Sequence, residues 1–169
     1  MSISLDEITI RTDPRPGDLG YLIHMHGDLY GREYGFGLQF ETYVARSVAE
    51  FLENYDASRD RIWLCEHEDR IIGTIVLMHR EGNSAQLRYF LIHPDYRGIG
   101  LGKRLMEMWL EFAREVGYER AYLLTTEELY AAISLYERHG FTVTSESDST
   151  AFGRPLREQR YDLELGEAF

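Results

Sequence analysis

The 169-residue chain has one cysteine, four prolines and no low-complexity stretch. Its single cysteine, Cys65, cannot form a disulfide within the chain, and its surroundings, RIWLCEHE, predict a buried thiol. No apolar run approaches the roughly 20 residues that a membrane-spanning helix needs. The first 18 residues are acidic and lack the apolar core of a secretion signal. These absences exclude a disulfide-stapled secreted scaffold and a membrane protein, and they predict a cytoplasmic location.

Positive charge is also scarce, because 18 lysines and arginines stand against 29 aspartates and glutamates, for a formal net charge of −11. Nucleic-acid binding depends on basic surfaces that neutralise phosphates, so we expect no nucleic-acid partner. The chain is 44% hydrophobic and 28% charged, as in ordinary folded proteins. Its length suits one domain over residues 1–169.

Hydrophobic periodicity gives the order of the elements. Two helical segments come early, a group of strands follows, and helices and strands then alternate. This order predicts a mixed α/β (α+β) domain, with a twisted, mostly antiparallel sheet of six to seven strands flanked by about four helices. The predicted helices cover residues 18–33, 38–55, 98–116 and 127–140, and the predicted strands cover 7–12, 61–68, 70–81, 84–94, 120–126, 141–147 and 159–165.

The segment LRYFLIHPDYRGIGLGKRL (87–105) is the most informative in the chain. A predicted strand runs into three closely spaced glycines flanked by basic residues, where the helix of residues 98–116 begins. Unpaired N–H groups and the helix dipole favour an anion at such a position, and glycines let a phosphate approach the backbone. The pattern predicts a diphosphate site. The spacing fits neither a P-loop nor a dinucleotide fingerprint, and a flexible turn without a ligand is the remaining alternative.

The spacing that does fit is R-x-x-G-x-G, from Arg97 to Gly102. Together with AISLYERHGF (132–141), it resembles the two signatures of the GNAT family of N-acetyltransferases, in the same order along the chain. The resemblance covers residues 8 to 165 and implies the GNAT fold, with acetyl-CoA as co-substrate and an amine as acceptor. The segments 16–36, 87–102 and 149–165 further resemble the acetyltransferase half of MarR–GNAT fusion proteins. The chain shows no preceding DNA-binding domain, so we expect no repressor role.

The resemblance also implies roles for individual residues. The backbone of Phe90, Leu91 and Ile92 would bind the pantetheine arm and polarise the thioester carbonyl. Tyr136 would give a proton to the departing CoA thiolate, although it could instead only pack against the sulfur. The pyrophosphate would lie on the loop formed by Arg97, Gly98, Ile99, Gly100, Leu101, Gly102 and Lys103.

The chain departs from the family pattern at Leu129, where an asparagine commonly contacts the pantetheine arm. We expect Thr125 or Thr126 to replace that contact, if it is kept at all. The general base stays open among several candidates, and none is assigned. They are His24, His26, Glu33, Glu41, Glu66 and His67. The two-residue spacing of His24 and His26 does not suit a metal pair on a helix, so no metal site is predicted.

The segment YGREYGFG (30–37) lies where the family varies its acceptor specificity, so Tyr30, Tyr34 and Phe36 are candidates for the acceptor wall. Arg88 could pair with a carboxylate on the acceptor, or it could form a structural ion pair. The sequence therefore predicts an N-acetyltransferase that acts on a small primary amine, such as an amino acid, by direct attack in a ternary complex. A silent acetyl-CoA sensor or interaction module is the alternative, transfer of another acyl group stays open, and a homodimer is possible.

Overall fold

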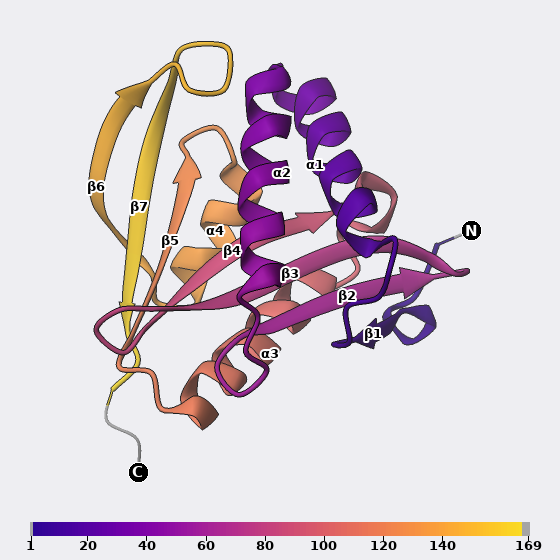
Figure 1. The fold of residues 1–169 in the computed structure, drawn as a ribbon, viewed down its shortest axis with the longest axis horizontal. Helices are drawn as coiled ribbons and strands as arrows, with labels where there is room; N and C mark the ends of the chain where they lie inside the picture. The colour runs from indigo at the N-terminus through magenta and orange to yellow at the C-terminus, as the bar shows by residue number, and fades with distance from the viewer. Residues whose placement is uncertain (1, 167–169) are drawn as a thin grey trace.

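The computed structural model describes residues 2–166 and contains one seven-stranded sheet in the order β1-β2-β3-β4-β5-β7-β6 (Figure 1). Only β4 and β5 pair in parallel, and every other neighbouring pair is antiparallel. The predicted mixed, mostly antiparallel sheet is therefore confirmed. The strands are β1 (Thr9–Arg11), β2 (Arg61–His67), β3 (Arg70–Arg80), β4 (Ser84–Ile92), β5 (Arg120–Thr126), β6 (Thr142–Ser149) and β7 (Leu156–Glu164).

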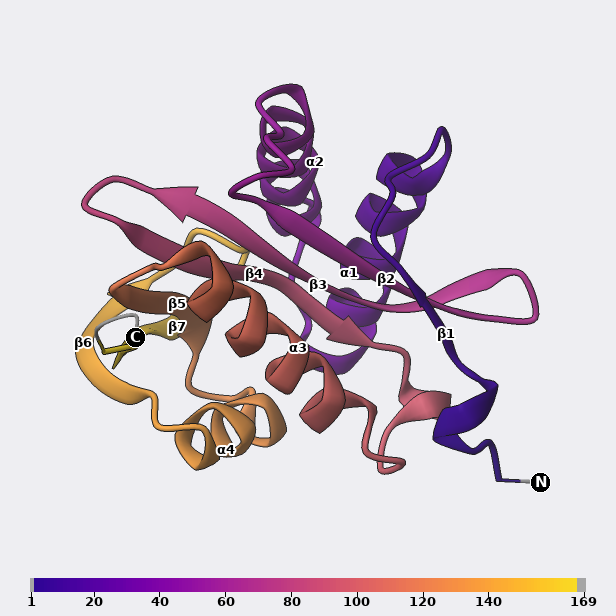
Figure 2. The same ribbon diagram turned by 90° about the horizontal axis from the view of Figure 1, so that it is seen from below.

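Four helices cover the two faces of the sheet, as Figure 2 shows. On one face lie α1 (Asp18–Tyr34) and α2 (Leu38–Glu53), and on the other lie α3 (Leu101–Val116) and α4 (Tyr130–Arg138). Each face has its own apolar core, centred on α2 in the first case and on Trp109 of α3 in the second. No helix among residues 2–166 is long and apolar enough to cross a membrane.

The element order matches the prediction, and the differences fall at element ends. The third helix begins at Leu101 rather than Gly98, because Gly98 and Gly100 adopt φ values of +80° and +91°, outside the helical region. The fourth begins at Tyr130 rather than residue 127, because the N–H of Glu127 still bonds to the Arg157 carbonyl beside β5. The third strand of the central group ends at Ile92, before a 3-10 turn over Pro94–Tyr96.

A β-bulge in β4 controls which side chains face which helices. Thr74 pairs with Leu91 and Val76 with Arg88, so one residue of β3 faces two residues of β4, Tyr89 and Phe90. Tyr89 has a φ of +49°, and the Thr74 hydroxyl donates a 2.6 Å hydrogen bond to its carbonyl. The bulge reverses the alternation of the strand, so two consecutive side chains face α2.

Contacts on either side of the bulge confirm this reversal. Arg88 bonds to the Tyr43 hydroxyl, and the Tyr89 hydroxyl donates to Ser47, both on α2. Phe90 and Ile92 instead pack into the core beside α3 and α4. The bulge thus separates a part of β4 that faces α2 from a part that faces α3 and the glycine loop.

Strands β4 and β5 diverge beyond the bulge. They pair only from Ser84 to Leu87 with Arg120 to Leu123, whereas β5 stays paired with β7 along its whole length. The last residues of β4 therefore have β3 on one side and no strand on the other. The result is a V-shaped gap at the carboxyl ends of the two strands.

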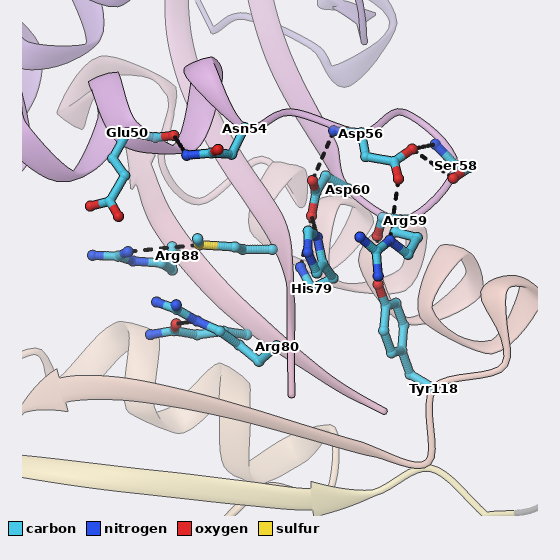
Figure 3. Close-up of polar contacts among 12 residues, drawn as sticks. Glu50, Asn54, Asp56, Ser58, Arg59, Asp60, His79, Arg80, Arg88 and Tyr118 are labelled. Carbon is cyan, nitrogen blue, oxygen red and sulfur yellow. Dashed lines mark hydrogen bonds and ion pairs between the residues drawn. The ribbon is translucent and has the colours of Figure 1, made fainter. Parts of the chain in front are cut away.

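A buried carboxylate fixes the other end of β3. Asp60 is 1% exposed and accepts hydrogen bonds from the Asp56 N–H at 3.0 Å, the His79 N–H at 2.7 Å and His79 Nδ1 at 2.7 Å (Figure 3). These bonds join the α2–β2 loop to β3. Because three donors converge on one carboxylate, its loss leaves several buried polar groups unpaired.

We predict that Asp60→Asn lowers the free energy of unfolding by about 2–3 kcal/mol, since an amide cannot accept all three bonds. Urea unfolding should show a lower midpoint with an unchanged slope. Asp56→Asn is the matched control, because the Asp56 carboxylate bonds only to Ser58 and Arg59 on the surface of the same loop. Equal losses in both variants would contradict this role for Asp60.

Candidate active site

A cavity of about 270 Å³ opens at the V-shaped gap. Residues from α1, α2, β4, β5, α4 and the loop between β6 and β7 form its wall, so the cavity joins both faces of the sheet. Nine of the nineteen residues that line it are aromatic. The aromatic residues are His26, Tyr30, Phe36, Phe40, Tyr43, Tyr89, Phe90, Tyr136 and Phe152.

The backbone of β4 supplies free donors to the gap. The His93 N–H bonds to the Ile72 carbonyl of β3 at 2.8 Å. Backbone groups alternate along a strand, so the N–H and C=O groups of Phe90 and Ile92 point away from β3, into the gap. Their carbonyls accept from the Tyr30 hydroxyl at 3.4 Å and from Arg97 Nε at 2.9 Å. The two N–H groups are therefore available to an acceptor-rich ligand.

The glycine loop follows immediately and presents more backbone N–H groups. The first helical hydrogen bond of α3 runs from the Arg104 N–H to the Gly100 carbonyl, at 3.1 Å. The N–H groups before Arg104, in the first turn of α3, therefore have no helical partner. A Cβ on Gly98 or Gly100 would meet no atom within 4 Å, and both positions need glycine for their positive φ. Leu101 is buried in the core, so only its backbone can meet a ligand. The loop has the geometry of an anion site made from backbone groups.

Arg97 is committed to the protein itself. Its guanidinium makes two bonds to the Glu33 carboxylate, at 2.8 and 2.9 Å, and its Nε bonds to the Ile92 carbonyl. The side chain therefore ties α1 to the end of β4, beside the loop that we expected it to serve with its charge. The exposed Lys103 lies 3.9 Å from Glu107 and keeps its ammonium in solvent.

Tyr136 comes from α4 and closes the gap opposite β4. Its ring lies 6.1 Å from both the Phe90 and Phe141 rings, measured between centroids, and its side chain is 5% exposed. Burial raises the pKa of the Tyr136 hydroxyl well above its ordinary value of 10. The hydroxyl is therefore protonated at neutral pH.

The cavity wall near α1 and α2 is built from two loops that are distant in sequence. The Gly37 N–H donates to the Phe152 carbonyl at 2.8 Å, and the Phe152 ring packs on Phe36 and Phe40. Phe152 was not among the expected wall residues: segment 149–165 carries a resemblance to known sequences, but nothing in it indicates that this loop meets residues 30–37. Of the expected wall residues, Tyr30 and Phe36 line the cavity, whereas Tyr34 packs behind them.

His26 is the one candidate base in the cavity wall. Its Nδ1 lies 2.8 Å from the Leu22 carbonyl, which can only accept, so Nδ1 carries the proton and Nε2 carries the lone pair. Nε2 is buried and has no partner among residues 2–166. Burial lowers the pKa of His26 to about 4, so the ring is neutral at physiological pH. Glu33 and Glu66 are held by arginines, and His67 bonds to the Tyr96 hydroxyl.

Two hydroxyls at the end of β5 also lack partners. Thr125 and Thr126 both line the cavity, and neither side-chain oxygen has a hydrogen-bond partner within the described chain. Leu129, which stands where the family commonly has asparagine, lines the cavity as well. The wall therefore offers hydroxyl groups at the place where the usual amide side chain is missing.

Comparisons with known proteins agree with this arrangement. The model of the acetyltransferase (GNAT) family matches residues 27–141. The chain is 37% identical over 98 residues, 56% of its length, to YjgM, an uncharacterized N-acetyltransferase of Escherichia coli K12. It spans 59% of YjgM and about half the length of the other curated relatives it matches.

Solved structures share the fold. The yncA protein of Salmonella typhimurium, solved with its cofactor acetyl-CoA, superposes with a TM-score of 0.74 at 20% identity, over 95% of each chain. Spermidine N-acetyltransferase of Vibrio cholerae, in complex with CoA and spermine, superposes with a TM-score of 0.71 at 20% identity, over 96% of this chain and 98% of that one. Since the family model covers well over half of its residues, this chain belongs to the GNAT family of acetyltransferases.

Proposed function

We propose that the protein transfers an acetyl group from acetyl-CoA to a primary amine of a small molecule, such as an amino acid or amine metabolite. The observation that carries this proposal is the junction at the end of β4. There, unpaired N–H groups of Phe90 and Ile92 adjoin the free backbone of the glycine loop, with Tyr136 across the gap. These backbone N–H donors lie along one path, so they suit a ligand with acceptor groups along its length, namely a diphosphate, an amide-bearing arm and a thioester carbonyl.

The residues of the loop from Arg97 to Lys103 would hold the pyrophosphate through their backbone, at the positive end of the α3 dipole. The N–H groups of β4 would bind the pantetheine arm, and Thr125 or Thr126 would give it a side-chain contact. Acetyl-CoA supplies the activated acyl group. The role of Arg97 is to position Ile92 and Glu33, since its charge is already paired with the Glu33 carboxylate.

In the reaction, the amine nitrogen attacks the thioester carbon and the carbon–sulfur bond breaks. Negative charge on the carbonyl oxygen would be stabilised by the N–H groups of β4, which need no reorganisation during the reaction. Tyr136 would give its proton to the departing thiolate and regain the one that the amine releases. Attack is direct, so both substrates occupy the cavity together, consistent with a cavity that joins the two faces of the sheet.

The amine must lose a proton before it attacks, because an alkylamine with a pKa near 10.4 is mostly protonated at neutral pH. The lone pair of His26 Nε2 can accept a hydrogen bond from the amine, but its low pKa makes it a weak base. We leave the base unassigned. The finer resemblance to MarR–GNAT fusion proteins and a possible homodimer remain predictions.

The direct test is thiol release on mixing the purified protein with acetyl-CoA and a panel of amines. The proposed function predicts CoA release that depends on one or more of the amines. Calorimetric binding of acetyl-CoA with no release on any amine would favour the alternative, a sensor or interaction module. Absence of both binding and release would reject the proposal.

We predict that Gly100→Asp weakens CoA binding by about 100-fold relative to Gly100→Asn. The two side chains have nearly the same shape and tolerance of positive φ, so the difference isolates the carboxylate charge beside the phosphates, worth about 3 kcal/mol at 5 Å. Isothermal titration calorimetry would measure both dissociation constants. The difference between the two dissociation constants should become smaller at high salt. Equal affinities would show that the phosphates bind elsewhere.

We predict that Tyr136→Phe lowers kcat roughly 100-fold and leaves the dissociation constant for acetyl-CoA nearly unchanged, because it removes only the proton donor. Since its pKa is raised, Tyr136 stays protonated below pH 10, and kcat of the wild type should not fall there through its ionisation. Tyr118→Phe is the matched control, because the Tyr118 hydroxyl bonds to the Arg59 carbonyl outside the cavity. Unchanged turnover in Tyr136→Phe would remove the acid role.

A further inference from the structure

We infer that the acceptor carries a carboxylate set several bonds away from its reactive amine, and that Arg88, assisted by Arg80, binds this carboxylate. The inference rests on the proposed function and names the substrate class of the same cavity. The inferred acceptor differs from an α-amino acid, in which a single carbon separates the amine from the carboxylate.

Arg88 is held in place by groups that leave its charge unneutralised. One terminal nitrogen donates to the Tyr43 hydroxyl at 2.8 Å, and the guanidinium lies 4.8 Å from the centre of the Tyr89 ring. Its other contact is the Met78 sulfur at 3.9 Å. A guanidinium has five N–H donors, so these contacts fix its orientation and leave donors for a ligand.

No carboxylate of residues 2–166 forms an ion pair with Arg88, although acidic residues outnumber basic ones in this chain. Glu50 of α2 is drawn on the same side in Figure 3, but no ion pair joins the two. Arg97, by contrast, is paired with the Glu33 carboxylate through two hydrogen bonds. An oriented arginine without a counter-ion in a cavity wall is a site for a planar anion.

A second guanidinium converges on the same place. Met78 of β3 and Gln86 of β4 are direct cross-strand partners. Arg88 reaches Met78 across the strands, and Arg80 Nε donates to the Gln86 side chain at 2.8 Å. One arginine therefore contacts each member of this cross-strand pair, and Figure 3 draws Arg88 and Arg80 next to each other. Arg80 also lacks an ion pair among the described residues, so their positive charges add rather than cancel.

The position of this pair along β4 sets the length of the acceptor. Acetyl transfer takes place beside Phe90 and Tyr136, where the free backbone of β4 begins. Arg88 lies two residues from Phe90 and Gln86 lies four residues away. In a regular strand these steps span about 7 and 13 Å, and the bulge at Tyr89–Phe90 shortens both somewhat. The amine and the carboxylate must bridge this interval, which an α-amino acid cannot do.

The cavity wall also carries apolar and aromatic side chains. Tyr43, Leu124 and Phe152 line the cavity together with the polar Gln86, Thr125 and Glu158, so the linking segment of the acceptor can meet hydrocarbon and ring surfaces. The three parts together describe an amphipathic ω-amino carboxylate or the two ends of a short apolar peptide. Both share a terminal amine, an apolar middle and a distant carboxylate.

The test compares kcat/KM for amino acids of graded length: glycine, 4-aminobutyrate, 6-aminohexanoate and 8-aminooctanoate. Hexylamine is the control that has the amine and the apolar chain but no carboxylate. A dialanine peptide tests whether a short peptide can supply the amine and the distant carboxylate. We expect kcat/KM to rise from glycine to a maximum at one of the longer acids, about 10- to 100-fold above hexylamine, mainly through KM. A higher value for dialanine than for any of the acids would assign the site to peptides.

In the wild type we expect kcat/KM to be higher for 6-aminohexanoate than for hexylamine. Arg88→Met should remove this preference, so that the ratio of the two values is close to one. Arg80→Met should lower the same ratio by less. Arg88→Lys keeps the positive charge but loses the planar pair of N–H donors that binds a carboxylate, so it should give an intermediate ratio. Arg114→Met, an exposed site on α3, is the matched control and should keep the wild-type ratio. Retained acetyl-CoA binding in calorimetry shows that each variant is folded.

The outcomes separate the two proposals. Transfer to hexylamine and 6-aminohexanoate at equal rates, or a maximum at glycine, would overturn the distant carboxylate and leave the acetyltransferase assignment intact. A wild-type preference for the carboxylate that survives Arg88→Met would overturn the role of Arg88. No transfer to any amine, with acetyl-CoA bound, would reject the proposed function itself.

Discussion

The hydrogen bond from the Thr74 hydroxyl to the Tyr89 carbonyl secures the bulge on which the rest of the site depends. The bulge holds a non-glycine residue at positive φ, a conformation that persists only where the surroundings enforce it. It also reverses the alternation of side chains, so that Arg88 and Tyr89 face α2 while Phe90 and Ile92 face α3 and the glycine loop. One local irregularity thus gives a single strand two functions.

The site uses backbone and aromatic surface more than charge. The donors predicted to hold the diphosphate are main-chain N–H groups, and the nearest arginine, Arg97, is already neutralised by Glu33. Three buried polar atoms in the wall, on His26, Thr125 and Thr126, have no partner among the described residues. A buried polar atom without a partner is destabilising, so these positions favour ligand binding at the expense of the stability of the ligand-free protein.

The cavity is closed by contacts between segments that lie far apart in the chain. Phe152 of the β6–β7 loop packs against Phe36, and Arg154 bonds both to the Tyr34 carbonyl at 2.6 Å and to the Glu128 side chain. The two loops lie far apart in sequence, and no local pattern in either one indicates that they meet. Sequence patterns could therefore indicate an aromatic acceptor wall at residues 30–37 but not its other half.

The sequence by itself determined the order and type of the elements, the glycine loop after β4 and the position of Tyr136 on the last helix. Each of these follows from local periodicity or from a short motif, which a single segment contains in full. Only the tertiary structure decided that Arg97 turns to Glu33, that Tyr34 lies behind the cavity, and that Arg88 and Arg80 converge on the Met78–Gln86 pair. These outcomes depend on strand register, on the bulge and on packing between distant segments, and no local pattern encodes those.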